Sequence, residues 1–367
     1  MASNTPTSTG PRLGFGLYRH MLNKEHYQFA RQVGATAVVV HLVDYTGQLS
    51  REREQQSDDQ PVHGNDGWGV TSGDWSVWSR DSLYQLKKDL EEHDLTLEAI
   101  ENFDPAHWYD VLLGGPRRDE QIAGICEIIE NLGAVGIPIM GYNFSIAGVA
   151  SRVQGPFARG GALSVGVEHV EDTPIPDGMV WNMRYRPQEG DRTIPPATHE
   201  QLWERLEYFL ERVLPVAERA GVVLAAHPDD PPAPFVRQQP RLIYQPEMYH
   251  TLFERVPSSA SKAEFCVGSL QEMEGADLYT LTEQLAREDR IGYIHFRNVV
   301  GKVPNYHEVF VDEGDLDLPR IMKILVANNY GGVLIPDHTP QLACQAPWHS
   351  GMAYAMGYMQ GLLKQFE

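Results

Sequence analysis

The chain has 367 residues, of which 42% are hydrophobic and 10% aromatic, enough for a substantial core and unlike the composition of a disordered protein. Its 30 basic and 50 acidic residues give a formal net charge of −20, which argues against nucleic acid and anionic membranes as partners. Three cysteines form no disulfide framework, the N-terminus lacks an apolar signal segment and no apolar run reaches 18 residues, so we expect a globular cytoplasmic protein.

Eight short β-rich runs recur along the chain. They cover residues 13–19, 35–42, 95–102, 136–144, 222–229, 263–270, 291–298 and 331–338. Helices are predicted between them, most clearly over residues 82–93, 118–132 and 199–220, where apolar side chains recur at helical spacing. Because strands that alternate with helices pair in parallel, eight such units predict an α/β fold with a closed (β/α)8 TIM barrel. The alternative is an open doubly wound sheet, but the Gly-rich phosphate turn typical of its first strand is missing.

We interpret residues 1–367 as a single barrel domain with two long insertions. They cover residues 43–79, after the second strand, and 145–196, after the fourth. Both follow a strand, so they emerge on the face where barrel enzymes carry their sites. Their tryptophans and arginines are typical of lids over a polar ligand. A subunit contact is the alternative for these insertions, and we expect a homo-oligomer.

Each of the last four strands carries one residue of a metal-binding type near its end. These residues are His227, Cys266, His295 and Asp337. Each alone has an ordinary explanation as a core residue or a helix cap. The carboxyl ends of adjacent parallel strands, however, meet at one rim of a barrel, so we expect the four side chains to lie together. Two imidazoles, a thiolate and a carboxylate form a mixed ligand set that suits a divalent ion such as zinc, iron(II) or manganese.

Seven segments of the sequence resemble those of the D-mannonate dehydratases, a family of the xylose isomerase-like barrel group. In the family's order they read GYNF (141–144), HPDDPP (227–232), QPRLI (239–243), FCVGSL (265–270), HFRNV (295–299), YHEVFVDEGDLDLPRIM (306–322) and IPDH (335–338). The resemblance implies dehydration of a sugar acid, D-mannonate, to 2-keto-3-deoxy-D-gluconate. It also implies Mn²⁺ or Fe²⁺ rather than Zn²⁺ as the ion, held by His227, Cys266, His295 and Asp337.

Such a dehydration builds negative charge on the substrate carboxylate, and the leaving hydroxide needs a proton. A histidine is the simplest acid or base at neutral pH. We prefer His338, which follows the proposed ligand Asp337, and keep His307 and Tyr142 as further catalytic candidates. The alternative for His307 is a polar brace formed with the adjacent Glu308.

Arg297 is predicted to bind the substrate carboxylate, because strand alternation places it on the same face as His295. The alternative is an ion pair between Arg297 and Asp229 or Asp230. We expect these two aspartates to orient the metal-bound imidazoles. Further substrate-binding candidates are Asn143, Arg241, Asn298 and His349.

The sequence departs from the family's pattern where substrate would be recognised. The PDH motif continues as TPQ (339–341) where the family usually has Gly-Arg, and the later aromatic segment reads APWHSGMAY (346–354). Two alternatives to a mannonate dehydratase therefore stay open. One is another sugar isomerase, epimerase or lyase on the same metal framework, and the other is a non-catalytic sugar-binding protein.

Overall fold

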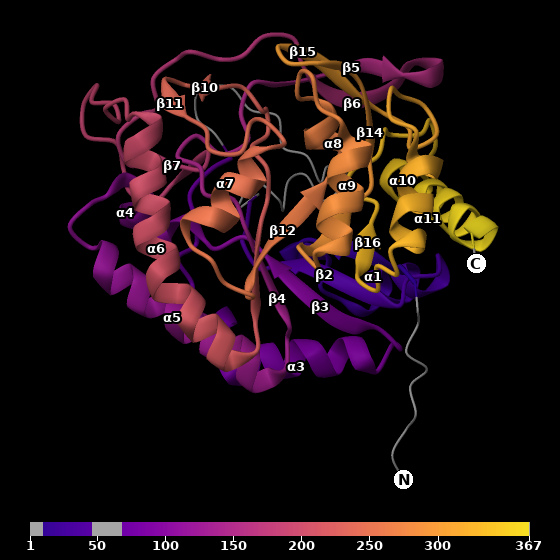
Figure 1. Ribbon diagram of the computed structural model, residues 1–367, viewed down its shortest axis with the longest axis horizontal. Coiled ribbons are helices and arrows are strands. Elements are labelled where there is room, and N and C mark those ends of the chain that lie inside the picture. Colours follow the sequence, from indigo (N-terminus) through magenta and orange to yellow (C-terminus); the bar gives the residue numbers. More distant parts are fainter. Residues whose placement is uncertain (1–9, 46–67, 367) are drawn as a thin grey trace.

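The computed structural model describes residues 10–45 and 68–366. Eight parallel strands close into a barrel (Figure 1), in the order β1 (Arg12–Leu17), β16 (Val333–Ile335), β13 (Ile291–His295), β12 (Ser261–Cys266), β9 (Val223–Ala226), β4 (Ile139–Tyr142), β3 (Thr96–Glu101) and β2 (Ala37–His41). Each strand overlaps one of the eight runs expected from the sequence. The closed (β/α)8 barrel is therefore confirmed, and the open sheet is excluded.

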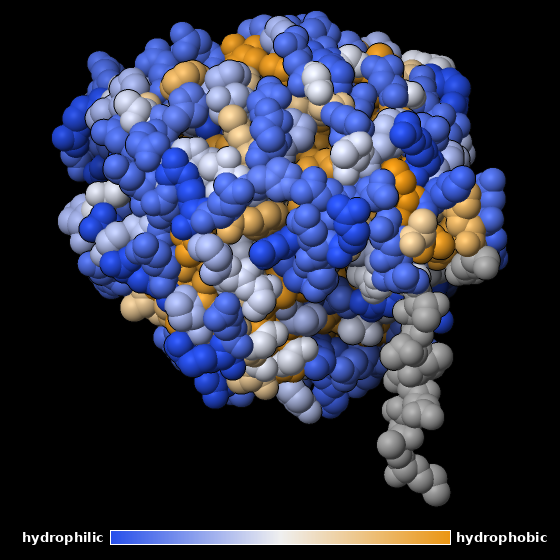
Figure 2. All heavy atoms as spheres, in the orientation of Figure 1, coloured by the Kyte–Doolittle hydropathy of each residue, from blue (hydrophilic) through white to orange (hydrophobic). Residues whose placement is uncertain are grey.

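Helices cover the outside of the barrel (Figure 1). The three that the sequence predicts are α3 (Arg80–Glu91), α5 (Arg118–Val135) and α6 (His199–Ala220). The others are α1 (Lys24–Gln32), α4 (Pro105–Leu113), α7 (Met248–Arg255), α8 (Val267–Gln271), α9 (Leu278–Arg287), α10 (Leu318–Ala327) and α11 (Pro347–Phe366). Figure 2 shows hydrophilic residues over most of the face viewed. Within residues 10–45 and 68–366, we find no helix with the length and apolar character needed to cross a bilayer.

Side chains of the strands alternate between the barrel interior and the side covered by helices. The interior cluster combines the small residues Ala37, Ala99 and Ala225 with larger aliphatic residues and a tyrosine. The outward residues, such as Val38 and Met140, belong to the larger core shared with the helices. At the carboxyl end of each strand the inward positions become polar, and this change places the site at that rim of the barrel.

The two insertions carry structure of their own. Residues 145–196 include β5 (Arg152–Ala158), β6 (Ala162–Val167), β7 (Met179–Val180) and β8 (Met183–Arg184). Strands β5 and β6 form a four-stranded antiparallel sheet with β14 (Asn298–Lys302) and β15 (Asn305–Val309), in the upper part of Figure 1. Of the first insertion, residues 46–67 lie outside the described residues. The single-domain assignment and the homo-oligomer remain predictions.

Candidate metal centre and pocket

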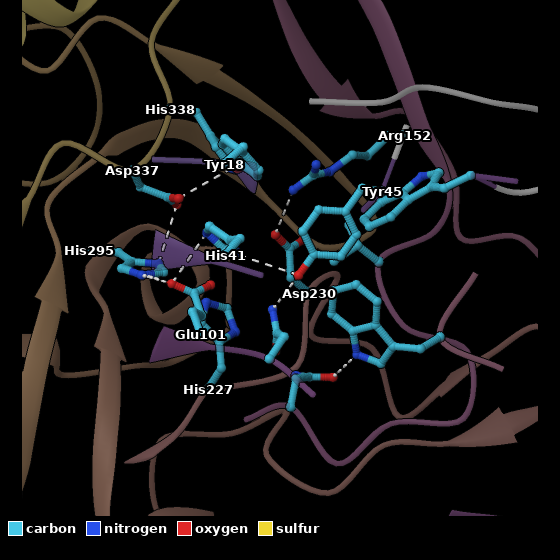
Figure 3. A pocket seen from close by; sticks show the side chains of 15 residues that line it. Tyr18, His41, Tyr45, Glu101, Arg152, His227, Asp230, His295, Asp337 and His338 are labelled. Atoms are coloured by element: carbon cyan, nitrogen blue, oxygen red, sulfur yellow. Dashed lines mark hydrogen bonds and ion pairs between the residues drawn. The ribbon is translucent and has the colours of Figure 1, made fainter. Parts of the chain in front are cut away.

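A pocket opens at the carboxyl end of the barrel strands (Figure 3). His227, His295, Asp337 and His338 line it together with aromatic residues, among them Tyr45. In Figure 3, Tyr45 lies beside His41 and on the other side of the pocket from His295 and Asp337. Residues of both insertions contribute to the lining.

Three of the four predicted metal ligands form a tight group. The ligand atoms of His227, Cys266 and His295 all lie within 4.8 Å of one another. Asp337 lies beside this group, with Oδ2 at 3.6 Å from Nδ1 of His295. Strands β9, β12, β13 and β16 thus bring the predicted residues to one place.

The hydrogen bonds of the two histidines leave one ring nitrogen of each free for a metal ion. His227 donates from Nδ1 to the carbonyl oxygen of Pro228 at 2.5 Å, so Nε2 is the nitrogen of this ring that is available to a metal ion. His295 donates from Nε2 to Glu101 at 3.2 Å, while its buried Nδ1 makes no hydrogen bond. Such partners fix the tautomer of metal-bound histidines, so the donor set fits a divalent cation.

The CVGS segment shapes the surroundings of the thiol. Cys266 caps α8 and accepts hydrogen bonds from the backbone N–H and the hydroxyl of Ser269, at 3.4 and 3.3 Å. Burial opposes its ionisation, but Arg297 and the two imidazoles hold the pKa of Cys266 well below its usual value. The thiolate is the form of cysteine that binds metals.

Two acidic residues that the sequence analysis missed lie next to His295. Oxygen atoms of Glu101 and Glu264 are 3.2 and 3.4 Å from its Nε2. Burial opposes it, but His41 and His295 lower the pKa of Glu101 to about 2. Burial and the charge of Glu101 raise the pKa of Glu264 well above its usual value. Glu101 is therefore the ionised partner that holds His295.

Arg297 does not line the pocket, contrary to its predicted role as the carboxylate clamp. It is 2% exposed, and partners surround its guanidinium group: Asp337, Glu272, Asp230, Ser269 and Glu308, at 2.9 to 3.4 Å. A guanidinium group has five N–H donors, so these partners leave none for a substrate. The alternative pairing with Asp230 is the one found.

The two aspartates of HPDDPP do not contact the imidazoles, contrary to expectation. Asp229 accepts hydrogen bonds from Arg241 and from the backbone N–H groups of Leu242 and Ile243, at 2.8 to 3.1 Å. The turn is thereby tied to the QPRLI segment. Asp230 lines the pocket and accepts from Arg152 at 3.3 Å.

Strand β15 separates the two residues of the HE pair. His338 lies in the pocket, with Nδ1 at 3.1 Å from Glu308 and Nε2 at 3.2 Å from Asp337. Burial opposes it, but these two carboxylates raise the pKa of His338 above its usual value. His307 faces the other way, because neighbours on a strand alternate, and it stacks on Phe157 at 3.9 Å. The structure therefore removes His307 from the catalytic candidates and makes Glu308 a partner of His338.

The side chains of Tyr142 and Asn143 also point in opposite directions, because neighbouring side chains alternate along a strand. Tyr142 points outward, where it packs near Phe209, and its buried hydroxyl has no hydrogen-bond partner. Asn143 lines the pocket and accepts a hydrogen bond from Nε1 of Trp181 at 3.1 Å. Asn143 therefore keeps its predicted position, and Tyr142 does not.

The remaining substrate-binding candidates lie outside the pocket. Asn298 begins β14, rather than ending β13, and its side chain binds the backbone of Leu316. Arg241 is fully buried and donates to Ser145 at 2.5 Å. His349 lies on α11 and packs edge-on against Phe29 at 4.7 Å. A structural role accounts for the contacts of all three.

Arg152, His41, Tyr18 and Trp181 line the pocket and were not predicted. His227 was predicted because the carboxyl ends of parallel strands meet at one rim of the barrel. The same reasoning applies to His41, which ends β2, and to Glu101, which ends β3. For Arg152 and Trp181 the sequence provided only the general expectation that tryptophans and arginines of the insertions lie over the site, and it did not single out either residue.

The closed barrel carries a candidate buried metal site, the His227, Cys266 and His295 group, at the carboxyl end of its strands. A "Xylose isomerase domain protein" from Planctomyces limnophilus shares the fold, with a TM-score of 0.56 and 12% identity over 97% of this chain and 99% of that one. The sequence model of the D-mannonate dehydratase (UxuA) family matches residues 69–154 and 192–367, and the chain belongs to this family.

Individual relatives agree with this assignment. The mannonate dehydratase of Streptococcus pneumoniae (strain 70585) is 32% identical over 277 residues, which cover 71% of this chain and 74% of the relative. That of Streptococcus suis (strain 05ZYH33) is 33% identical over the same shares. The crystal structure of mannonate dehydratase from Streptococcus suis serotype 2 superposes with a TM-score of 0.75 and 25% identity, over 97% of this chain and 93% of that one.

Proposed function

We propose that this protein is a metal-dependent hydro-lyase that converts D-mannonate to 2-keto-3-deoxy-D-gluconate and water. Membership of the D-mannonate dehydratase family supports the reaction and the substrate. The observation that carries the proposal is the group of His227, Cys266 and His295, whose ligand atoms converge within 4.8 Å at the pocket.

In this proposal Asp337 completes the ligand set, and the ion is Mn²⁺ or Fe²⁺, with Zn²⁺ less suited. Two imidazoles, a thiolate and a carboxylate leave coordination positions for substrate oxygens on an ion that accepts more than four ligands. When bound, the ion stabilises the negative charge that develops on the carboxylate as the neighbouring carbon loses its proton.

Arg152 is the residue that we assign to the substrate carboxylate in place of Arg297. It lines the pocket, and among residues 10–45 and 68–366 its guanidinium group donates one hydrogen bond, to Asp230 at 3.3 Å. A guanidinium group with free N–H donors can bind a carboxylate through two parallel hydrogen bonds.

His338 is the proposed general acid that protonates the leaving hydroxide. Its imidazole lies between Glu308 and Asp337, two carboxylates that favour the protonated ring. Such a group contributes typically about 10²–10⁴-fold to a rate. Glu308 is a positioning residue, because it holds the ring without lining the pocket.

The test compares Cys266→Ser with Cys126→Ser. Cys126 is half-buried on α5, away from the pocket, so the second variant matches the chemistry of the first without touching the site. We expect metal analysis of the purified wild-type protein to find a bound divalent ion, and Cys266→Ser to lose both this ion and the formation of 2-keto-3-deoxy-D-gluconate. Cys126→Ser should keep both.

Two results would contradict the proposal. One is unchanged metal content in Cys266→Ser, which would show that the ion binds elsewhere. The other is the absence of product from D-mannonate with manganese, iron(II) or zinc. This result would refute the proposed reaction but not the proposed metal centre.

A further inference from the structure

Part of the pocket lies outside the region that the family model matches. Tyr45, Trp68 and Trp181 line the pocket, and their ring centroids are 5.4 to 5.7 Å apart. We call these three rings the aromatic wall. The matched residues are 69–154 and 192–367, so all three rings lie outside the matched region. In Figure 3, Tyr45 lies on the other side of the pocket from His295 and Asp337.

The two insertions meet to build the aromatic wall. The backbone N–H of Trp68 donates to the carbonyl oxygen of Asn182 at 2.7 Å, and that of Arg184 donates to Gly69 at 2.8 Å. Trp181 is tied to the end of β4 by a backbone hydrogen bond to Ile146 at 2.7 Å. The wall is thus a built part of the pocket and not a chance contact of two loops.

Trp181 occupies this place at a conformational cost. Its φ angle is 51°, in the left-handed region that bulky side chains rarely adopt. Gly148 leaves the space it needs, because a Cβ atom there would lie 2.7 Å from the backbone of Trp181. Strained residues of this kind cluster at functional sites, which suggests a function for the position of this ring.

The wall presents carbon to a ligand, because protein groups already occupy the polar atoms of two of its rings. Nε1 of Trp181 donates to Asn143 at 3.1 Å. The hydroxyl of Tyr45 accepts from Asn102 at 3.0 Å. It also lies 3.3 Å from Nδ1 of His41, which accepts its proton when the Nε2–H of that ring faces Glu101.

We propose that the aromatic wall selects a sugar acid whose end remote from the carboxylate carries a methyl group instead of a hydroxymethyl group, that is, a 6-deoxyhexonate. The inference rests on the proposed function, which requires the carboxylate and the reacting carbons of the substrate to face Arg152 and the metal ligands His227, Cys266 and His295. The remote end of the substrate then meets the wall. A hydroxyl there would have to compete for polar atoms of Trp181 and Tyr45 that protein groups already occupy, whereas a methyl group gains apolar contact. An apolar pocket rejects an added hydroxyl by up to about 10²-fold.

The experiment compares 6-deoxy-D-mannonate with D-mannonate on the manganese-loaded protein. We measure kcat/KM for both acids and, independently of turnover, their Kd by titration of tryptophan fluorescence. We expect the deoxy acid to be preferred about tenfold or more in both quantities. Trp181→Asn should lower this ratio to about one or below, because asparagine tolerates a left-handed backbone and offers an amide to the hydroxyl.

Two further variants serve as controls. Trp181→Phe retains a carbon surface and should retain the preference. Trp75→Phe, at a half-exposed tryptophan that does not line this pocket, should leave the ratio unchanged.

The outcomes separate the two proposals. Product from both acids without preference, or with a preference for D-mannonate, overturns the role of the wall and leaves the dehydratase standing. No product from either acid with tighter binding of the deoxy acid overturns the reaction and supports the wall. No product with equal binding overturns both. The wild-type ratio decides even where a variant fails to fold.

Discussion

The change Gly268→Ala tests the packing beneath the metal group. A Cβ atom at this position would lie 2.6 Å from Cγ and 2.7 Å from Cζ of Arg297. The guanidinium group cannot yield easily, because it is bonded to Asp337, Glu272 and their neighbours. Overpacking costs about 1–3 kcal/mol, and the loss of one charge-assisted hydrogen bond about 1.5–3 kcal/mol. We therefore expect the free energy of unfolding to fall by roughly 2.5–6 kcal/mol.

Urea unfolding followed by circular dichroism measures this loss, and metal analysis shows whether the site is affected. The matched control is Gly357→Ala on α11, where an added Cβ atom has no neighbour within 4 Å. This control should be as stable as the wild type or up to about 1 kcal/mol more stable, because alanine is the better helix former. Equal stability of the two variants, with full metal content in Gly268→Ala, would refute the argument that Arg297 is fixed.

The remaining predictions concern Tyr142, whose side chain points away from the pocket, and Gly148, which packs against Trp181 of the aromatic wall. Tyr142→Phe removes a buried hydroxyl without a hydrogen-bond partner, so stability should be equal or higher by up to about 1 kcal/mol and kcat unchanged. A tenfold loss of kcat in steady-state kinetics would instead return Tyr142 to the catalytic residues. Gly148→Ala places a Cβ atom against the backbone of Trp181 and requires alanine at a φ of 63°, so it should abolish the preference for the deoxy acid. Retention of the wild-type kcat/KM ratio would contradict this prediction.

Strand positions could be predicted from the sequence because a barrel fixes them by simple geometry. The rule that parallel strands end at one rim was enough to expect His227, Cys266 and His295 together. The same rule would have identified Glu101. Strand alternation also explains why Tyr142 points outward, since it follows the inward Gly141.

The contacts of long charged side chains could not be predicted in this way. Arg297 stands at the expected place, yet its N–H groups all bind protein partners. These partners lie just after β16, just after α8, in the HPDDPP turn and on β15. Sequence spacing does not count such partners. Trp181 was equally out of reach, because its place depends on a left-handed backbone within an insertion.

The charge of the chain gives a reason for the proposed roles of the metal ion and of Arg152. A chain of net charge −20 that gathers Glu101, Asp230 and Asp337 at one rim repels an anionic sugar acid unless local positive charge opposes that field. The N–H groups of Arg297 bind other protein side chains, so its charge offsets the carboxylates of Asp337 and Asp230 and none of its N–H groups is left for the substrate. In the proposed function this attraction comes from the metal ion, Arg152 and the protonated ring of His338. The proposal therefore couples the metal centre to the substrate site through electrostatics, and it assigns to the aromatic wall the distinction between one sugar acid and another.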